Sequence, residues 1–276
     1  MRINGKASCC AIAGLLFASS VLAQIEVIPQ SQPESVFAGA PRQLCITIRN
    51  PGQDPVQGEL HYALNQKATA VAAPIARAAW KKIHVLPTQT VIECEKMSFP
   101  SIRSPTPFLI QWTVDKHVVG RTDVLVYPPD LLHELKTLIS SQVVGAFDPR
   151  NVIKPLLVQH KIDYEDLERM ELEQFTGSIV IAGPFTDADQ MPPRLAARLR
   201  KLAARSIPAV WIQPPQRAAT PAPSWCCVRE GGRLIVIAQD NTVANLAESP
   251  TAQLAFIELV KTALHGKDPH LPDDKD

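Results

Sequence analysis

The pattern of apolar and polar residues changes near residue 127 and divides the chain into two parts. In the first part, apolar residues alternate with polar ones in short runs, for example at Leu44, Ile46 and Ile48, before the turn residues Asn50-Pro51-Gly52. Period-two alternation is typical of strands that bury one face. About seven such runs, with no helical stripe between them, predict an antiparallel β-sandwich of the Ig-like kind over residues 24–127.

After Pro128-Pro129, strand-like and helix-like patterns alternate. The central run, residues 177–184, is apolar on both faces before it ends at Gly183-Pro184, which is typical of a covered strand in a parallel sheet. Similar apolar runs lie at residues 143–147, 207–212 and 234–238. This order predicts a three-layer α/β domain with a mostly parallel sheet over residues 128–266, and hence an α+β multidomain chain.

The helices of the second part have recognisable ends. We expect Asn151 to cap a helix with Pro155 in its first turn or at a kink. Ser249-Pro250 should start the last helix and Gly266 should end it. The buried stripe of that last helix is expected to be Leu254, Ile257, Val260 and Leu264.

The first residues predict export. Arg2 and Lys6 precede a short apolar run, and Val21-Leu22-Ala23 has small residues where a signal peptidase requires them. We therefore interpret residues 1–23 as a cleaved signal peptide and the location as periplasmic or extracellular, the alternative being a retained anchor. The charged residues 267–276 are expected to form a disordered tail.

Charge and cysteines narrow the classes of partner. Of the 28 Lys and Arg residues, 26 follow the signal, against 27 Asp and Glu, and this balance argues against nucleic acid and membrane surfaces as partners. In an oxidising compartment Cys45 can pair with Cys94, although two half-buried thiols are the alternative. Cys226 and Cys227 are expected to pack within a hairpin; a reactive thiol or a strained bond between them is the other interpretation.

One edge of the predicted sheet collects polar residues. Ligands of open α/β sheets bind beyond the carboxyl ends of the strands, and the candidates there are Asp148, Gly183, Asp187 and Asp240. Such carboxylates can hold a hard cation. They can equally cap helices and bind loop amides, which we favour because no metal-binding motif accompanies them, so neither metal nor cofactor is expected.

A second candidate site is basic. The side chains of Arg194, Arg198, Lys201 and Arg205 are spaced to form one stripe on the helix after the central strand. A solvated helix face is the usual meaning of such a stripe. The functional alternative is contact with an acidic partner, an envelope protein or a polysaccharide.

The order of the second part is similar to the class I glutamine amidotransferase-like modules of exported bacterial proteins. The likeness covers about residues 131–266 and rests on Gly-Ser-Ile-Val-Ile-Ala-Gly-Pro, a helix introduced by proline, and a Gly-Gly-Arg-Leu-Ile-Val-Ile hairpin. In catalytic members the cysteine nucleophile sits on the turn after the central strand. Here that turn is Gly183-Pro184-Phe185, so the resemblance implies the module without its nucleophile.

These observations favour an exported, non-catalytic protein that binds or assembles in the cell envelope. The first alternative is a hydrolase or amidotransferase-like enzyme that uses Asp148, Asp187 and Asp240, provided that they converge. The second is a carbohydrate-binding accessory module, which requires a row of exposed aromatic side chains; Trp80 and Trp112 are more simply explained as core residues.

The signal interpretation predicts cleavage after Ala23 on export. Mass spectrometry of the protein recovered from the periplasm or medium should find Gln24 at the amino terminus. A cytoplasmic protein that still carries Met1 would contradict the interpretation.

Overall fold

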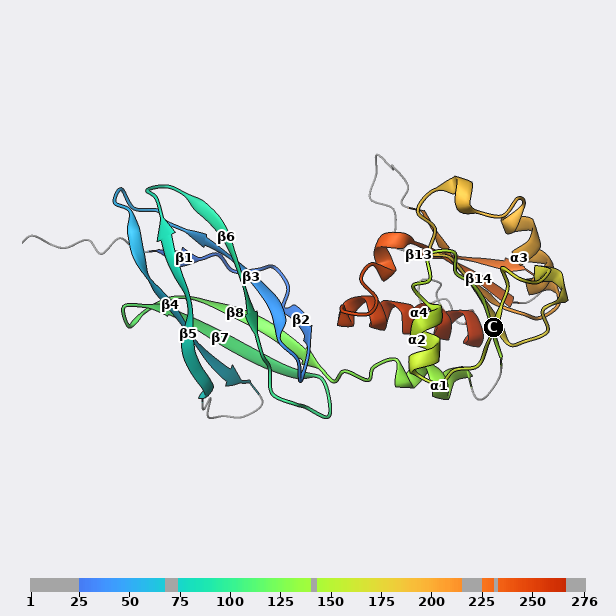
Figure 1. The fold of residues 1–276 in the computed structure, drawn as a ribbon, viewed down its shortest axis with the longest axis horizontal. Helices are drawn as coiled ribbons and strands as arrows, with labels where there is room; N and C mark the ends of the chain where they lie inside the picture. The colour runs from blue at the N-terminus through green and yellow to red at the C-terminus, as the bar shows by residue number, and fades with distance from the viewer. Residues whose placement is uncertain (1–24, 68–73, 140–142, 215–224, 231–232, 267–276) are drawn as a thin grey trace, which may run out of the picture.

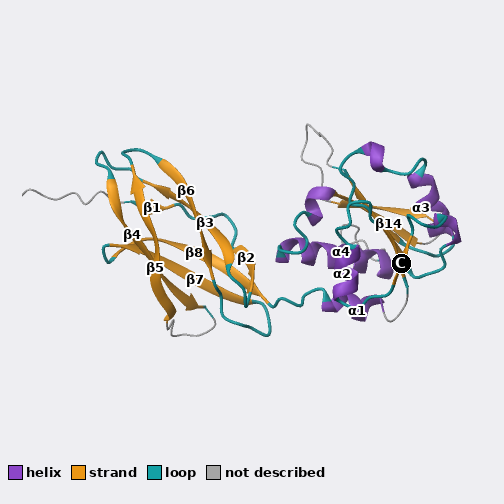
Figure 2. Ribbon diagram, in the orientation of Figure 1, coloured by secondary structure: helices purple, strands orange, loops and turns teal. Residues whose placement is uncertain are grey.

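The computed structural model describes residues 25–67, 74–139, 143–214, 225–230 and 233–266, so the predicted signal peptide and tail lie outside the described residues. The described chain is mostly β-structure and forms two lobes (Figures 1 and 2). The first lobe contains strands only, and helices appear after the chain leaves strand β8. Within the described ranges, none of the helices has the length and apolarity needed to cross a membrane.

Two sheets build the first lobe. The three-stranded sheet has the order β1-β3-β6 and the five-stranded sheet has the order β2-β8-β7-β4-β5. Their strands are β1 (Glu26–Val27), β2 (Glu34–Phe37), β3 (Arg42–Arg49), β4 (Val56–Gln66), β5 (Pro74–Val85), β6 (Thr90–Met97), β7 (Thr106–Val114) and β8 (His117–Tyr127). The alternating apolar residues of both sheets share one buried cluster, as the period-two pattern predicts.

Trp112 is the largest residue of this cluster. Its side chain is fully buried, and its indole Nε1 donates a hydrogen bond to Thr122 Oγ1 at 2.8 Å, which satisfies the one polar atom of the ring. The ring centroid of Trp80 lies 4.9 Å away. The interpretation of Trp112 as a core residue is therefore confirmed.

The sequence predicts a purely antiparallel first lobe, and this prediction is wrong for one strand. Strand β2 pairs parallel to β8, in a register that places Glu34 opposite Val124. A hairpin forces antiparallel pairing, but β2 and β8 stand at opposite ends of the lobe's sequence and no short turn joins them. The sequence did not predict the parallel edge strand, because its direction depends on a long-range pairing.

A disulfide and an ion pair close the first lobe. Cys45 and Cys94 stand directly opposite each other on β3 and β6, and a disulfide joins them. Lys81 of β5 forms an ion pair with Glu93 of β6 at 2.7 Å. Because β5 and β6 are end strands of different sheets, this pair ties the two sheets together along one edge.

A six-stranded mixed sheet forms the centre of the second lobe. Its order is β10-β9-β11-β12-β14-β13, parallel throughout except for β13, which pairs antiparallel to β14 as the predicted hairpin. The strands are β9 (Val144–Phe147), β10 (Tyr164–Asp166), β11 (Ile179–Ala182), β12 (Ala209–Gln213), β13 (Trp225–Glu230) and β14 (Arg233–Gln239).

Strand β11 is buried on both faces, as its unbroken apolar run predicts. Ile179 and Ile181 belong to a cluster with α1 (His133–Ile139), α2 (Lys154–Gln159) and α4 (Pro250–His265). Val180 and Ala182 belong to another cluster, with α3 (Leu195–Ala204). Alternate side chains of one strand therefore hold two groups of helices against the sheet.

The last helix begins and ends as predicted. The Ser249 hydroxyl accepts a hydrogen bond from the Ala252 amide, a proline follows in the first turn, and Gly266 adopts a left-handed conformation at the C-cap. One member of the expected buried stripe is wrong, because Leu254 is 36% exposed.

Two expectations near β9 need correction. Asn151 does not cap α2; it lies before the helix with φ +52°, and Asp148 receives the loop amides instead. The acidic stretch after Tyr164 contains the short edge strand β10, which the sequence did not indicate because three residues are too few for a period. Pro155 sits in the first turn of α2, as one of the two interpretations required.

Candidate functional site

The order of the six-stranded sheet changes direction between β9 and β11. The chain moves from β9 outward to β10 and then returns to β11 on the other side of β9. In an open parallel sheet, the crevice beyond the carboxyl ends at such a point is the usual ligand site. This crevice lies between Asp148, after β9, and Gly183, after β11, which are both sequence candidates.

The crevice is closed by backbone and by an aromatic side chain. The Gly183 amide donates a hydrogen bond to the Phe147 carbonyl at 2.8 Å. Phe185 is fully buried, with its ring centroid 6.0 Å from that of Phe147. Gly183 has φ +103°, and an added Cβ would collide with the carbonyl oxygen of Ile212, so only glycine fits this close approach. The turn packs as core.

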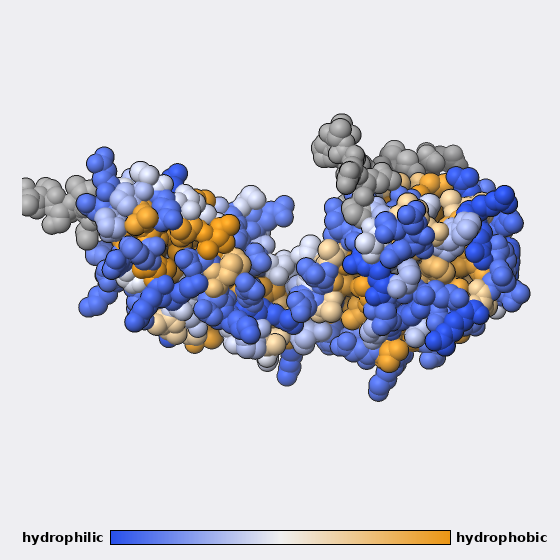
Figure 3. All heavy atoms as spheres, turned by 45° about the horizontal axis from the view of Figure 1, so that its top comes forward, coloured by the Kyte–Doolittle hydropathy of each residue, from blue (hydrophilic) through white to orange (hydrophobic). Residues whose placement is uncertain are grey.

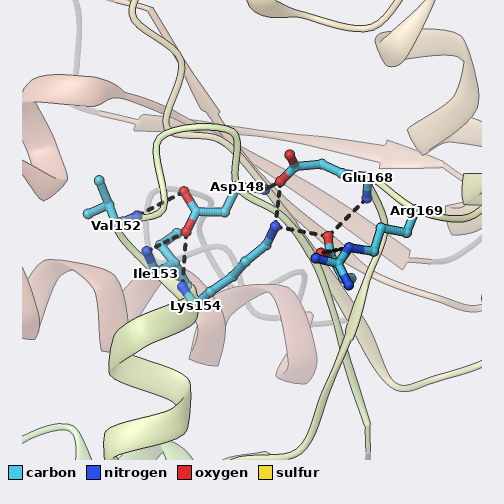
Figure 4. A network of polar contacts seen from close by, with 7 residues as sticks. Asp148, Val152, Ile153, Lys154, Glu168 and Arg169 are labelled. Atoms are coloured by element: carbon cyan, nitrogen blue, oxygen red, sulfur yellow. Dashed lines mark hydrogen bonds and ion pairs between the residues drawn. The ribbon is translucent and has the colours of Figure 1, made fainter.

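Asp148 is a buried carboxylate that organises the next loop. The residue is only 2% exposed. Its carboxylate accepts hydrogen bonds from the amides of Val152, Ile153 and Lys154 at 3.1, 2.7 and 2.9 Å (Figure 4). These amides belong to the start of α2 and have no intrahelical partner, so the carboxylate stabilises the helix start. Asp148 thus acts as the cap that the sequence analysis favoured.

Lys154 joins this loop to the edge strand. Its ammonium contacts Asp166 Oδ1 at 2.8 Å and Glu168 Oε1 at 2.5 Å, and its side chain is 12% exposed (Figure 4). Burial opposes the charged form, but hydrogen bonds and charge from both carboxylates raise the pKa of Lys154 above its usual value. The hydrogen bond from Lys154 lowers the pKa of Asp166. The pair is therefore charged at neutral pH.

The remaining carboxylate candidates are engaged separately. Asp187 accepts a hydrogen bond from the Gln190 amide at 3.1 Å and caps the short 3-10 helix η2 (Ala188–Gln190). Asp240 forms an ion pair with Arg150 at 2.9 Å. In the part of the chain that the structure describes, no three His, Cys, Asp or Glu side chains are grouped to hold a metal ion. The four candidates at this edge are thus brought to one side of the sheet but not to one centre.

The basic stripe is divided between packing and solvent. Arg198 donates to both carboxylate oxygens of Glu173, and this hydrogen bonding lowers the pKa of Glu173. Arg205 donates to the backbone carbonyls of Glu173 and Phe175. Arg194 and Lys201 are exposed, and Arg194 lies before α3 with φ +57°. Half of the stripe therefore fastens α3 to the loop before β11.

Cys226 and Cys227 lie on β13 at the edge of the sheet, and no disulfide joins them. Cys226 is exposed and pairs with Ile237 of β14. From the sheet order, β13 stands three strands from β11, or about 14 Å from the turn at Gly183. The exposed thiol is remote from the crevice.

A hollow that the sequence did not reveal lies on the outer face of the five-stranded sheet. It measures about 760 Å³ and is lined by outward-facing residues of β4, β5 and β7, among them His61, Ala63, Arg77, Gln111 and Thr113. The alternating pattern of each strand predicts only that these polar or small residues face outward. Their meeting depends on the cross-strand register, which no local pattern records.

The rest of the visible surface offers less. Figure 3 shows hydrophilic residues over most of the face in view, with apolar patches on both lobes. The exposed large apolar residues are Ile75, Leu86, Ile92, Val118, Val158 and Leu254, with no aromatic side chain among those described. Scattered exposed apolar residues are normal and need no functional explanation.

The ion pair of Lys154 predicts a specific pH dependence. Because the folded pKa of Asp166 is lowered, its stabilisation is complete above about pH 4 and is lost as the pH falls through the folded value. Asp166→Asn should therefore lower the unfolding free energy by about 1–2 kcal/mol at pH 7, measured by urea denaturation. The unfolding free energy of this variant should also fall less steeply than that of the native protein as the pH is lowered below about 4. The matched control Glu165→Gln, on the exposed face of the same strand, should change neither. Equal behaviour of the two variants would contradict the assignment.

Comparisons with known proteins assign no family to the chain. No protein-family model and no curated protein matches the sequence. Among solved structures, similarity is found to the Pseudomonas fluorescens alkylpurine DNA glycosylase AlkC (TM-score 0.30, 11% identity, 38% of this chain and 31% of that chain). It is also found to a beta-glucosidase from Listeria innocua (TM-score 0.29, 12% identity, 38% and 16%). This chain therefore matches less than a third of either protein, at a level of likeness too low to support any statement about function.

Proposed function

We propose that this chain is an exported, non-catalytic protein that binds a partner or assembles in the cell envelope. In this proposal the first lobe is an Ig-like β-sandwich with one parallel edge strand, over residues 24–127. The second lobe, residues 128–266, is a three-layer α/β domain that resembles class I glutamine amidotransferases. The shared cluster of two sheets and the helices on both faces of β11 support these two assignments.

The observation that carries the proposal is the packed turn after β11. In an amidotransferase this turn presents the nucleophile and backbone amides that stabilise developing charge. Here Gly183 is confined by Ile212, Pro184 has no amide hydrogen, and the ring of Phe185 is buried. A substrate carbonyl has no space and no attacking atom at this position.

The alternatives lack the feature that each requires. A hydrolase at the sheet edge needs convergent carboxylates, whereas Asp148 binds amides, Asp187 caps η2 and Asp240 pairs with Arg150. A carbohydrate-binding module needs an exposed aromatic platform, and none of the exposed large apolar residues among those described is aromatic. We therefore retain binding or assembly as the function.

The compartment is supported by covalent chemistry as well as by the signal-like sequence. The disulfide between Cys45 and Cys94 closes a loop with a sequence separation of 49 residues. Disulfides persist in oxidising compartments and are rare in the cytosol. An exported protein would keep this bond, which constrains the unfolded chain and so stabilises the first lobe.

A glutaminase assay tests the non-catalytic assignment. We expect the purified protein to release no ammonia from glutamine above the rate without protein, and Cys226→Ser to behave identically, because this thiol lies far from the turn. Ammonia release that disappears in Cys226→Ser would contradict the proposal and identify an atypical nucleophile. Release that survives this substitution would also contradict it, and would point to another residue.

A further inference from the structure

A row of four residues crosses the outer face of the five-stranded sheet. Arg77 of β5 pairs with Ala63 of β4, Ala63 pairs with Gln111 of β7, and Gln111 pairs with Arg121 of β8. These four strands lie side by side in the sheet (Figure 1). Both arginines are exposed, so the row presents two cations with an amide and a methyl group between them.

The small residue of this row, Ala63, lines the hollow. Ala63 lies between two long side chains, and the hollow of about 760 Å³ extends from it along β4. Its lining runs from Asn65 at one end to Glu59 at the other. At about 3.3 Å per residue this length is about 20 Å, which matches about six residues of an extended peptide.

The charge of the row is not compensated by its neighbours. In the part of the chain that the structure describes, neither Arg77 nor Arg121 forms an ion pair. Of the carboxylates on these strands, Asp123 pairs with Lys67 at 2.5 Å, and Glu59 stands four residues along β4 from Ala63, the residue paired with Arg77. The two arginines are about three strand spacings, or about 14 Å, apart at their backbones. A carboxylate between them would be attracted from both sides.

The opposite end of the hollow has no such excess. Glu59 and Asp115 are lining residues there, and Lys116 and Lys82 are their basic neighbours, with Lys82 directly opposite Glu59. The two signs balance at this end. At the other end Arg77 lines the hollow, and Arg121 stands beside the lining, on the strand next to Gln111. A ligand that fills the hollow therefore meets an excess of positive charge at that end only.

We propose that this hollow binds an extended peptide segment of a protein partner, with an acidic side chain placed over the row Arg77–Ala63–Gln111–Arg121. The side-chain amide of Gln111 and the hydroxyl of Thr113 can exchange hydrogen bonds with a peptide backbone. The inference rests on the proposed binding function and adds the chemistry of the partner.

A polyanionic glycan fits the hollow less well. Its repeated carboxylates would extend over Glu59 and Asp115, where they gain no net attraction. A sugar chain would also lack an exposed aromatic ring to stack on, because Tyr62, the aromatic residue in the lining, packs its ring against Trp112. A peptide can place a single acidic residue at the positive end and neutral residues elsewhere.

The test is selection from a displayed library of random short peptides against the purified full chain. Selected peptides should share an Asp or Glu, and the Arg77→Gln/Arg121→Gln variant should bind them at least about tenfold more weakly by fluorescence anisotropy. Replacing the peptide's acidic residue by its amide should weaken binding to the native protein similarly. The matched control Arg103→Gln/Arg200→Gln removes two exposed arginines elsewhere and should bind as the native protein does.

Several outcomes would overturn the inference. These are no selected peptide, selected peptides without acidic residues, and equal binding by the Arg77→Gln/Arg121→Gln variant when its thermal unfolding matches that of the native protein. Binding of polygalacturonate that depends on the two arginines would replace the peptide with a glycan. None of these results bears on export or on glutamine hydrolysis, which are measured separately, so failure of the inference and failure of the proposed function remain distinguishable.

Discussion

The second lobe depends on one buried charge. A carboxylate taken out of water is costly unless hydrogen bonds replace its hydration, and Asp148 obtains three from the backbone at the start of α2. The same interaction fixes where α2 begins and hence where Lys154 stands. Through Lys154, the loop after β9 is connected to Asp166 of β10 and to Glu168. One edge of the sheet is thus held by a single polar network (Figure 4).

This network explains why the sheet edge is structural although its topology is that of a ligand site. Asp148, Asp187 and Asp240 follow the carboxyl ends of the strands, where ligands of such sheets usually bind. Each of the three carboxylates has a partner within the chain. At the centre of the edge, Gly183 approaches the Ile212 carbonyl closely and the Phe185 ring is buried, so this turn packs as core. On the first lobe, Arg77 and Arg121 are exposed and form no ion pair among the described residues. Under the proposal made above, recognition belongs to the first lobe, and the sheet edge of the second lobe is structural.

Local patterns predicted the features that depend on local physics. The two-sided apolar run of β11, the cap at Ser249 and the left-handed Gly266 each follow from a few adjacent residues, and the structure has them. Asp148, Gly183 and Asp240 follow the ends of β9, β11 and β14, because strand ends follow from the apolar runs.

Long-range pairing decided several features that the sequence did not reveal. The parallel direction of β2, the edge strand β10 and the row that joins Arg77 to Arg121 all depend on register between distant segments. The helix cap after β9 was missed for a related reason. Asn151 lies closer to the helix in sequence and was therefore expected to cap it. The carboxylate of Asp148 is buried and needs hydrogen-bond donors, and it accepts the hydrogen bonds of these amides instead.

The unfolding free energy of Asp148→Asn tests most directly whether this edge is structural. The account predicts a loss of about 2–4 kcal/mol at pH 7, because the neutral amide cannot replace three hydrogen bonds to a buried carboxylate. Asp187→Asn, at an exposed cap, should cost less than about 1 kcal/mol and serves as the control. A carboxylate kept for a ligand commonly sacrifices stability, so its removal would be neutral or stabilising. An Asp148→Asn protein as stable as the native one, or more stable, would contradict the account.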